Sequence, residues 1–197
     1  GNIFICIKGE HVDGHDFAKM AVTNGAIAII SEKELTEIDI PVLQVKETEL
    51  AIAQIAAWFY DFPSKELNLI GITGTNGKTT VTHLIENIFE KADLKCGLIG
   101  TLGNRYSSTD EYVSSGHTTP QASDLQRVFK DFLDKAIKNA VMEVSSHAIA
   151  QRRIAETAFK GAVLTNLTQD HLDYHITMEN YFLAKSKLFS TLENTAT

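Results

Sequence analysis

Cysteine is scarce in this sequence of 197 residues, which contains only Cys6 and Cys96. Neither lies near a second cysteine or a histidine at the spacing of a metal or redox motif. A disulfide framework and a zinc site built on cysteine are therefore excluded. We expect two reduced thiols that are at least partly buried, as is usual for a protein of a reducing compartment.

Positive charge and long apolar runs are also in short supply. The 18 lysines and arginines are outnumbered by 25 acidic residues, which gives a net charge of -7 and a pI near 5.5. This balance argues against a nucleic-acid partner, which would require a basic face. No apolar run approaches the length of a membrane span, and no signal peptide is visible, so no membrane partner is expected.

Short apolar runs alternate with helical patterns along the whole chain. This rhythm predicts an α/β fold with a parallel or mixed sheet covered by helices. A small α/β domain is expected over residues 1–62 and a phosphate-loop domain with a parallel sheet over 67–197, separated by a linker at 61–64. We expect Trp58, Phe59 and Tyr60 to be packing residues. Strands are predicted at residues 3–7, 26–30, 42–45, 67–73, 95–99, 140–142 and 162–164, and helices at 17–24, 50–60, 80–89, 124–138 and 178–192.

The most informative motif lies between the strand at 67–73 and the helix that follows it. It consists of Gly74, Thr75, Asn76, Gly77, Lys78, Thr79 and Thr80. A glycine turn that opens a helix can hold phosphate on backbone N–H groups, with Lys78 reaching the phosphates and the Thr79 hydroxyl suited to Mg²⁺. The usual motif has a glycine six positions before the lysine, where this chain has Ile72. A plain turn between strand and helix is the alternative.

Polar residues follow two later strands. Glu143 comes directly after the strand at 140–142, at the sheet edge where such folds bind ligands, and its carboxylate could hold Mg²⁺. His171 belongs to a segment with two carboxylates and two imidazoles, Asp170-His-Leu-Asp-Tyr-His175, that could form a metal or phosphate site. The alternatives are a surface glutamate and a structural histidine.

Three other groups are uninformative from the residues alone. Arg152 and Arg153, after Gln151, could bind an anion, but a solvated charge cluster at a helix end is the simpler interpretation. Thr118 and Thr119 are two hydroxyls before a proline. From its residues alone, Lys185 is expected to be a solvated lysine on a helix face.

Taken together, these motifs resemble the Mur ligases, which build the peptide of bacterial peptidoglycan. The match is to the members that add the third residue, and it runs along essentially the whole chain. The residues that carry it are Phe4-Ile-Cys-Ile-Lys-Gly9, Asp13-Gly-His15, Thr73 to Thr80, Thr118-Thr-Pro120, Met142-Glu-Val-Ser-Ser-His147, Thr165 to His175 and Tyr181-Phe-Leu-Ala-Lys185.

The resemblance implies roles for individual residues. ATP would bind through Gly74 to Thr80, with Lys78, Glu143, His171 and Lys185 as catalytic residues. One Mg²⁺ would be held near Thr79 and Glu143 and a second near His171, with Lys185 carbamylated, because a bare ammonium would repel the metal. The residues that would hold UDP-N-acetylmuramoyl-dipeptide are Thr118, Thr119, Ser145, Gln151 and Arg153.

The implied reaction phosphorylates the carboxylate of the muramoyl-dipeptide, and the amine of a diamino acid then attacks the acyl phosphate. The third residue could be meso-diaminopimelate or L-lysine. The resemblance also implies a bacterial cytoplasmic enzyme, which we expect to be a monomer. His117 and Gln121 depart from the family pattern, so contacts from these two flanks are not carried over.

Both ends of the chain look cut, and the family's third domain, which binds the amino acid, has no counterpart in this sequence. We therefore expect a fragment that is inactive alone. A folylpolyglutamate synthetase is one alternative, although it has nothing resembling residues 1–62. A phosphate-loop switch protein is another, although no Asp-x-x-Gly follows a strand.

Overall fold

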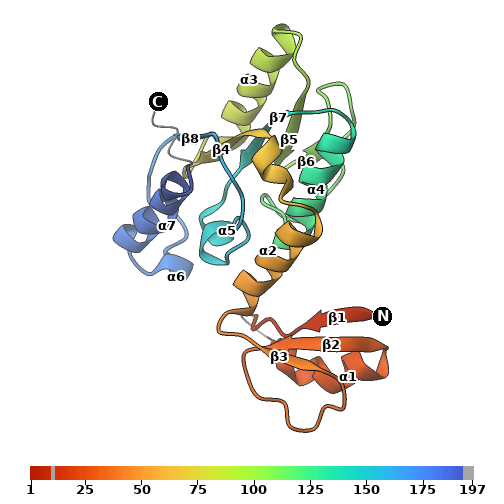
Figure 1. Cartoon of the computed structure of the whole chain (residues 1–197). Helices are drawn as coiled ribbons and strands as arrows, with labels where there is room; N and C mark the ends of the chain where they lie inside the picture. The colour runs from red at the N-terminus through yellow and green to blue at the C-terminus, as the bar shows by residue number, and fades with distance from the viewer. Residues whose placement is uncertain (10–11, 193–197) are drawn as a thin grey trace.

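The computed structural model describes residues 1–9 and 12–192, and this part of the chain forms two separate β-sheets (Figure 1). The first sheet has three parallel strands in the order β1-β2-β3. Its strands are β1 (Asn2–Ile5), β2 (Ala26–Ser31) and β3 (Val42–Gln44). A short 3-10 helix, η1 (Gly14–Phe17), and α1 (Ala18–Thr23) take the place of the single helix predicted over 17–24.

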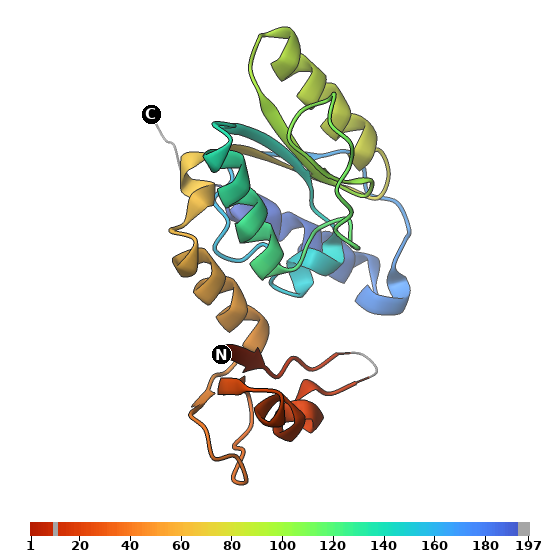
Figure 2. The same ribbon diagram turned by 90° about the vertical axis from the view of Figure 1, so that its right-hand side faces the viewer.

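Helix α2 (Thr48–Phe59) joins the first sheet to the rest of the molecule. It packs against α4 (Ala122–Asp134), as Figure 2 shows. Its buried stripe is made of small residues, Ala53, Ala56 and Ala57. The helix ends where Asp61 and Phe62 take left-handed backbone angles, so the predicted break before Pro63 is confirmed.

The expectation that Trp58 and Phe59 are packing residues is wrong, because each is 71% exposed. Successive residues of an α-helix are rotated by about 100° around its axis. Once Ala56 and Ala57 face α4, the next two side chains must point away from it. Hydrophobic character alone could not show which face of the helix is covered.

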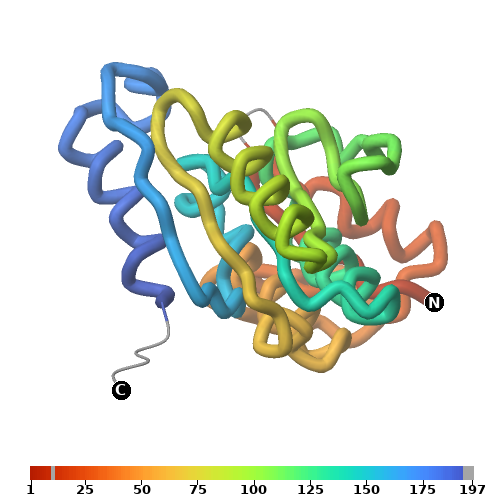
Figure 3. The backbone as a smooth tube through the Cα atoms, turned by 90° about the horizontal axis from the view of Figure 1, so that it is seen from above, coloured from red at the N-terminus to blue at the C-terminus, as the bar shows by residue number. Residues whose placement is uncertain are grey.

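The second sheet has five strands in the order β6-β5-β7-β4-β8. Four are parallel, and β6 runs antiparallel to β5, so the sheet is mixed, which is one of the two arrangements that the sequence predicts. Seen from above in Figure 3, α7 and β8 lie at one side of this sheet and the green chain around β6 at the other. The strands are β4 (Asn68–Thr73), β5 (Cys96–Gly100), β6 (Gly103–Arg105), β7 (Asn139–Glu143) and β8 (Gly161–Leu164).

Side-chain alternation along the strands gives this sheet two buried faces. Ile72, Leu98 and Val141 face α3 (Lys78–Lys91). The opposite face packs against α4, and α5 and α7 lie on that side as well (Figure 2). The strands are buried on both faces, which explains their nearly continuous apolar runs. The remaining helices are α5 (Ser146–Ala150), α6 (Leu172–His175) and α7 (Met178–Ser190).

Two predicted helices end earlier than expected. Helix α4 stops at Asp134 instead of residue 138, because Ala136 has a left-handed φ of 57°. Helix α7 stops at Ser190 instead of 192. Both cysteines are free and buried, as predicted, and burial raises the pKa of Cys96 to about 12. In the described ranges no helix combines the length and apolar character that crossing a bilayer requires. The division into domains at 1–62 and 67–197 stays a prediction.

We predict that Gly97→Ala destabilises the protein because β5 passes directly over Phe132. A Cβ at Gly97 would lie 2.5 Å from the buried Phe132 ring. Overpacking of this kind costs about 1–3 kcal/mol. The matched control is Gly161→Ala in β8, where the nearest atom would be 3.8 Å away. Urea unfolding should show a loss of stability for Gly97→Ala alone, and equal stability of the two variants would contradict the prediction.

Candidate functional site

The turn between β4 and α3 requires glycine. Gly74 has a φ of +145°, and a Cβ there would lie 1.9 Å from the Thr165 Oγ1 atom. Gly77 has a φ of +84° and precedes the first residue of α3. Ile72, which replaces the usual first glycine, is a fully buried residue of β4. The turn therefore starts later than in the common motif, at Gly74.

The segment after β8 holds this turn in place. Asn166 accepts hydrogen bonds from Thr75 N through its carbonyl and from Asn76 N through its side chain, both at 3.0 Å. Its side-chain amide and the Thr165 hydroxyl donate to Asn76 O, at 3.0 and 2.6 Å. Two N–H groups of the turn are thus already taken. No side chain caps α3, so the N–H groups of its first turn are the ones suited to an anion.

Two lysines meet at the carbonyl oxygen of Gly74. Lys78 Nζ donates to it at 2.9 Å and to Thr75 O at the same distance. Lys185 Nζ, from α7, also donates to Gly74 O at 2.9 Å. Two cations that converge on one neutral acceptor create a strong local preference for an anion.

Lys185 is buried, with 2% of its surface exposed, which contradicts the default interpretation of a solvated lysine. Its ammonium lies over the Tyr181 ring, 4.4 Å from the centroid. Burial, and then the charge of Lys78, lower the pKa of Lys185 to about 8, against the opposing effect of Asp170. Burial also lowers the pKa of Lys78, while Glu143 and Asp170 oppose it.

Glu143, the last residue of β7, is a buried carboxylate with 1% exposure. Thr101 holds it with its backbone N–H at 3.1 Å and its hydroxyl at 3.0 Å. Thr101 Oγ1 also contacts Thr118 Oγ1 at 3.1 Å. Thr101 did not emerge from the sequence, where a Gly-Thr pair directly after an apolar strand was its only signal. A Cβ at Gly100 would lie 2.4 Å from Glu143 Oε1, so the preceding glycine is required too.

Four of the predicted substrate residues form one connected group. Thr119 Oγ1 donates to Glu143 O at 2.9 Å and accepts from Ser145 N at 3.1 Å. Arg153 donates to Thr119 O at 3.0 Å and to Gln151 Oε1 at 2.5 Å. The Ser145 hydroxyl accepts from Ala148 N and so caps α5.

A cavity of about 580 Å³ lies beside this group, between the first sheet and the second. Gln151, Arg153 and Tyr174 contribute to its wall, together with the start of α4 and residues 7–9. Burial lowers the pKa of Arg153, while Tyr174 opposes the shift. Thr118, Thr119 and Ser145 do not line the cavity. Of the five predicted substrate residues, only Gln151 and Arg153 therefore face it directly.

Around His171 the structure brings several rings together. His147 lies 4.7 Å from His171 and 4.4 Å from Tyr174, between ring centroids. His171 has a left-handed φ of 52°, and its Nε2 atom is 3.5 Å from Asp170 Oδ2. Burial lowers the pKa of His175, with His147 as the next cause. Among the described residues, no three His, Cys, Asp or Glu side chains are grouped closely enough to hold a metal ion. Metal binding by Thr79, Glu143, His171 and Lys185 stays a prediction.

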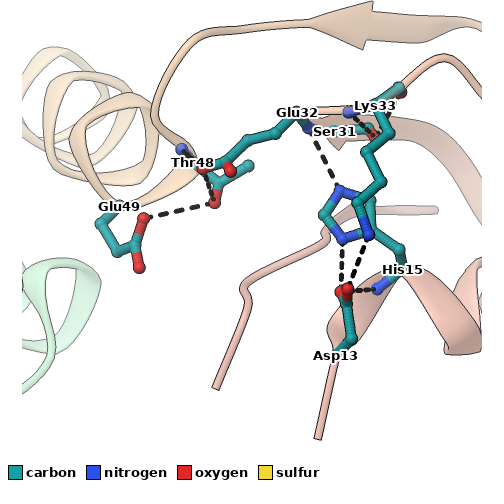
Figure 4. Close-up of polar contacts among 7 residues, drawn as sticks. All are labelled: Asp13, His15, Ser31, Glu32, Lys33, Thr48 and Glu49. Atoms are coloured by element: carbon teal, nitrogen blue, oxygen red, sulfur yellow. Dashed lines mark hydrogen bonds and ion pairs between the residues drawn. The ribbon is translucent and has the colours of Figure 1, made fainter. Parts of the chain in front are cut away.

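A second polar network lies in the first sheet and is drawn in Figure 4. Asp13 Oδ1 accepts from His15 N at 3.0 Å and from His15 Nδ1 at 2.5 Å, and Lys33 donates to Asp13 Oδ2 at 2.7 Å. The Lys33 hydrogen bond is the main reason why the pKa of Asp13 is lowered. Since Glu32 N donates to His15 Nε2 at 3.2 Å, this nitrogen carries no proton.

The same network continues into α2. Glu32 Oε1 accepts from the backbone N and the hydroxyl of Thr48, at 2.8 and 3.0 Å (Figure 4). A carboxylate at this position satisfies a free N–H and interacts favourably with the helix dipole. Glu47 then forms an ion pair with Arg152, at 3.0 Å. The Asp13-Gly-His motif is thus tied to the helix that connects the two sheets.

Both parts of the chain match a known protein family. Residues 1–60 match the family described as "Mur ligase family, catalytic domain", and residues 72–197 match "Mur ligase middle domain". UDP-N-acetylmuramoyl-L-alanyl-D-glutamate–2,6-diaminopimelate ligase of Bacillus velezensis is 51% identical over 98% of this chain and 39% of its own length. The Listeria innocua ligase of the same name is 50% identical, with the same coverage.

Solved structures give the same result. A structure of UDP-N-acetylmuramoyl-L-alanyl-D-glutamate–2,6-diaminopimelate ligase superposes with a TM-score of 0.81 at 32% identity, covering 98% of this chain and 39% of that one. A MurF ligase from Thermotoga maritima, solved with ADP, shares the fold, with a TM-score of 0.64 at 24% identity over 100% of this chain and 42% of that one. The chain spans about two fifths of the length of these relatives. On the family match along residues 72–197, the chain belongs to the Mur ligase family.

Proposed function

We propose that this chain is part of an ATP-dependent ligase of peptidoglycan synthesis in the bacterial cytoplasm. The ligase joins 2,6-diaminopimelate to the dipeptide of UDP-N-acetylmuramoyl-L-alanyl-D-glutamate. The observation that carries the proposal is the meeting of Lys78 and Lys185 at the phosphate turn, beside a buried carboxylate and next to a large cavity. The names of the relatives supply the substrate.

The arrangement suits transfer of a phosphoryl group to a carboxylate. The turn from Gly74 to Thr80 would hold the phosphates of ATP, with Lys78 on the transferred group. The muramoyl-dipeptide would lie in the cavity lined by Gln151 and Arg153, with its terminal carboxylate toward the turn. The carboxylate oxygen takes the γ-phosphoryl group and ADP leaves. The amine of the diamino acid then displaces phosphate and forms the amide.

The donors around Glu143 fit Mg²⁺. Its carboxylate is buried, and the hydrogen bonds that it accepts from Thr101 come from neutral donors. Thr118 contacts Thr101 through its hydroxyl, and the Thr79 hydroxyl at the start of α3 would be a further oxygen ligand, the kind that Mg²⁺ prefers. When bound, Mg²⁺ would neutralise charge on the phosphates. We propose His171 and carbamylated Lys185 as holders of a second ion.

A folylpolyglutamate synthetase is the nearest alternative within the fold. FolC of E. coli superposes with a TM-score of 0.51 at 17% identity, a likeness of fold alone that covers 79% of this chain. The match of residues 1–60 to a Mur ligase domain supports the peptidoglycan enzyme over this alternative. We propose a monomer that needs its amino-acid-binding domain, so the 197-residue chain alone should not form the amide.

The main test uses a ligase of full family length that carries this chain. Incubation with ATP, Mg²⁺, UDP-N-acetylmuramoyl-L-Ala-D-Glu and an equal mixture of meso-diaminopimelate and L-lysine should yield the diaminopimelate tripeptide by mass spectrometry. ATP should be consumed only when all substrates are present. Hydrolysis of ATP without any tripeptide would refute the function, and a lysine product would refute the choice of diamino acid.

Gly74→Ala should weaken binding of a non-hydrolysable ATP analogue at least tenfold, measured by calorimetry on the same ligase. The new Cβ would collide with Thr165 and strain a left-handed residue, a combined cost of about 2 kcal/mol or more. Gly25→Ala is the matched control, since Gly25 also has a positive φ, +91°, but open space around its Cβ. Equal affinities for all three proteins would show that the turn does not hold the nucleotide.

Lys185 should form a carbamate with CO₂. The neutral amine attacks CO₂ and releases a proton to solvent. At pH 7 a lysine with a pKa of about 8 is neutral in about one molecule in ten, against about one in three thousand at the ordinary value of 10.5. With ¹³C-bicarbonate, NMR should show a carbamate signal that grows from pH 7 to 8.5.

The matched controls for the carbamate are two lysine substitutions. The signal should be absent in Lys185→Ala, which should also lose ligation, and unchanged in Lys187→Ala on the same helix. A carbamate signal that survives in Lys185→Ala would show that another lysine is modified.

A further inference from the structure

Three residues of α3 form a stripe that faces the chain after β5. His83, Glu86 and Glu90 are spaced three and four residues apart, so they share one face of the helix. We call them the α3 stripe. Opposite them lies the segment of residues 105–117, which connects β6 to the region before α4 and runs past α3 in Figures 1 and 2. The proposed function assigns no role to either.

Tyr112 makes the contact nearest to the phosphate turn. His83 Nδ1 lies 2.7 Å from Thr79 O, and His83 Nε2 lies 2.5 Å from the Tyr112 hydroxyl. A carbonyl can only accept, so Nδ1 carries the proton and donates to Thr79. Nε2 of the neutral ring is then the acceptor, and Tyr112 donates to it. The chain of donors runs from Tyr112 through His83 to the first turn of α3.

Two further contacts fix the same segment on the stripe. Arg105 forms a largely buried ion pair with Glu86, and its guanidinium lies over the Tyr112 ring, 4.8 Å from the centroid. Ser108 N donates to Glu90 Oε1 at 2.8 Å. Every member of the α3 stripe is therefore engaged by this segment. These contacts are not confined to the surface, because Glu86 is buried, with 1% exposure.

The far end of the segment leads into Thr118 and Thr119. Thr118 contacts Thr101, which holds Glu143, while Thr119 bonds Glu143 O and accepts the Arg153 contact. The segment is thus anchored to the nucleotide-binding helix at one end and to the predicted substrate residues at the other. Thr118 follows this segment directly in the chain, so the segment links the first turn of α3 to Thr118.

We infer that Tyr112 is a positioning residue: through His83 it holds the segment of residues 105–117, and so Thr118 and Thr119, in register with the helix that follows the phosphate turn. This inference rests on the proposed function. Tyr112 acts on the muramoyl-dipeptide through the loop it anchors. Loss of its hydroxyl should therefore weaken the binding of that substrate and leave the binding of the nucleotide largely unchanged.

The test compares Tyr112→Phe with the wild type in the full-length ligase. The variant keeps the ring under Arg105 and removes only the hydroxyl. If the loss of this hydrogen bond leaves the segment in place in only a third to a tenth of the molecules, the affinity for the muramoyl-dipeptide falls about three- to tenfold by calorimetry, with ATP-analogue affinity within about twofold. The melting temperature should fall by no more than the few degrees that one lost hydrogen bond explains. Tyr106→Phe is the matched control, since its hydroxyl lies 3.5 Å from Asp131 of α4 and not on the α3 stripe.

A double-mutant cycle checks the route through His83. If both residues act through the contact between them, the double variant His83→Ala, Tyr112→Phe should bind the muramoyl-dipeptide no more weakly than His83→Ala alone. Additive losses of affinity would show that Tyr112 does not act through His83. Equal weakening of the binding of both ligands, a melting temperature lowered by more than one hydrogen bond explains, or an unchanged affinity would overturn the positioning role. Wild type that binds ATP but no muramoyl-dipeptide would instead overturn the proposed function, and the inference with it.

Discussion

The carbonyl oxygen of Gly74 is the point on which the site depends, because two lysines from distant parts of the chain donate to it. Burial lowers the pKa of both lysines, and the charge of Lys78 lowers that of Lys185 further. The arrangement persists because β4, the segment after β8 and α7 pack tightly around the turn. Tyr181 and Thr75 show this tightness, with their hydroxyls 3.2 Å apart in the interior. An anion bound here would relieve the repulsion between the two lysines, so this arrangement favours the binding of phosphate.

Glu143 supplies the opposite charge at the next strand of the sheet. The carboxylate is held by Thr101, and Gly100 leaves the space that it occupies. Two lysines and the partial charge of a helix N-terminus, set against the carboxylates of Glu143 and Asp170, leave a small local excess of positive charge. On the proposed function, a polyphosphate with its metal ion would balance that excess better than either would alone.

Local patterns predicted the parts of this site that are contiguous in sequence. The phosphate turn and Glu143 follow apolar strands, so strand periodicity was enough to locate them. Lys185 could not be found from its residues, because its burial depends on contacts with a turn 111 positions away. Thr101, His83 and Tyr112 were missed for the same reason, since their partners lie on other elements. The error at Trp58 and Phe59 has the same origin, because packing of α2 against α4 chooses which helix face is covered.

On the proposed function, the two sheets have to keep a defined separation so that the cavity between them fits the substrate. Two features of α2 do this. Its N-terminal Thr48 is hydrogen-bonded to Glu32, directly after β2, and an exposed ion pair joins the preceding Glu47 to Arg152, after α5. Its alanine stripe lets it lie close against α4. On the proposed function, the placement of α2 would set how the cavity wall formed by residues 7–9 lies relative to Gln151 and Arg153.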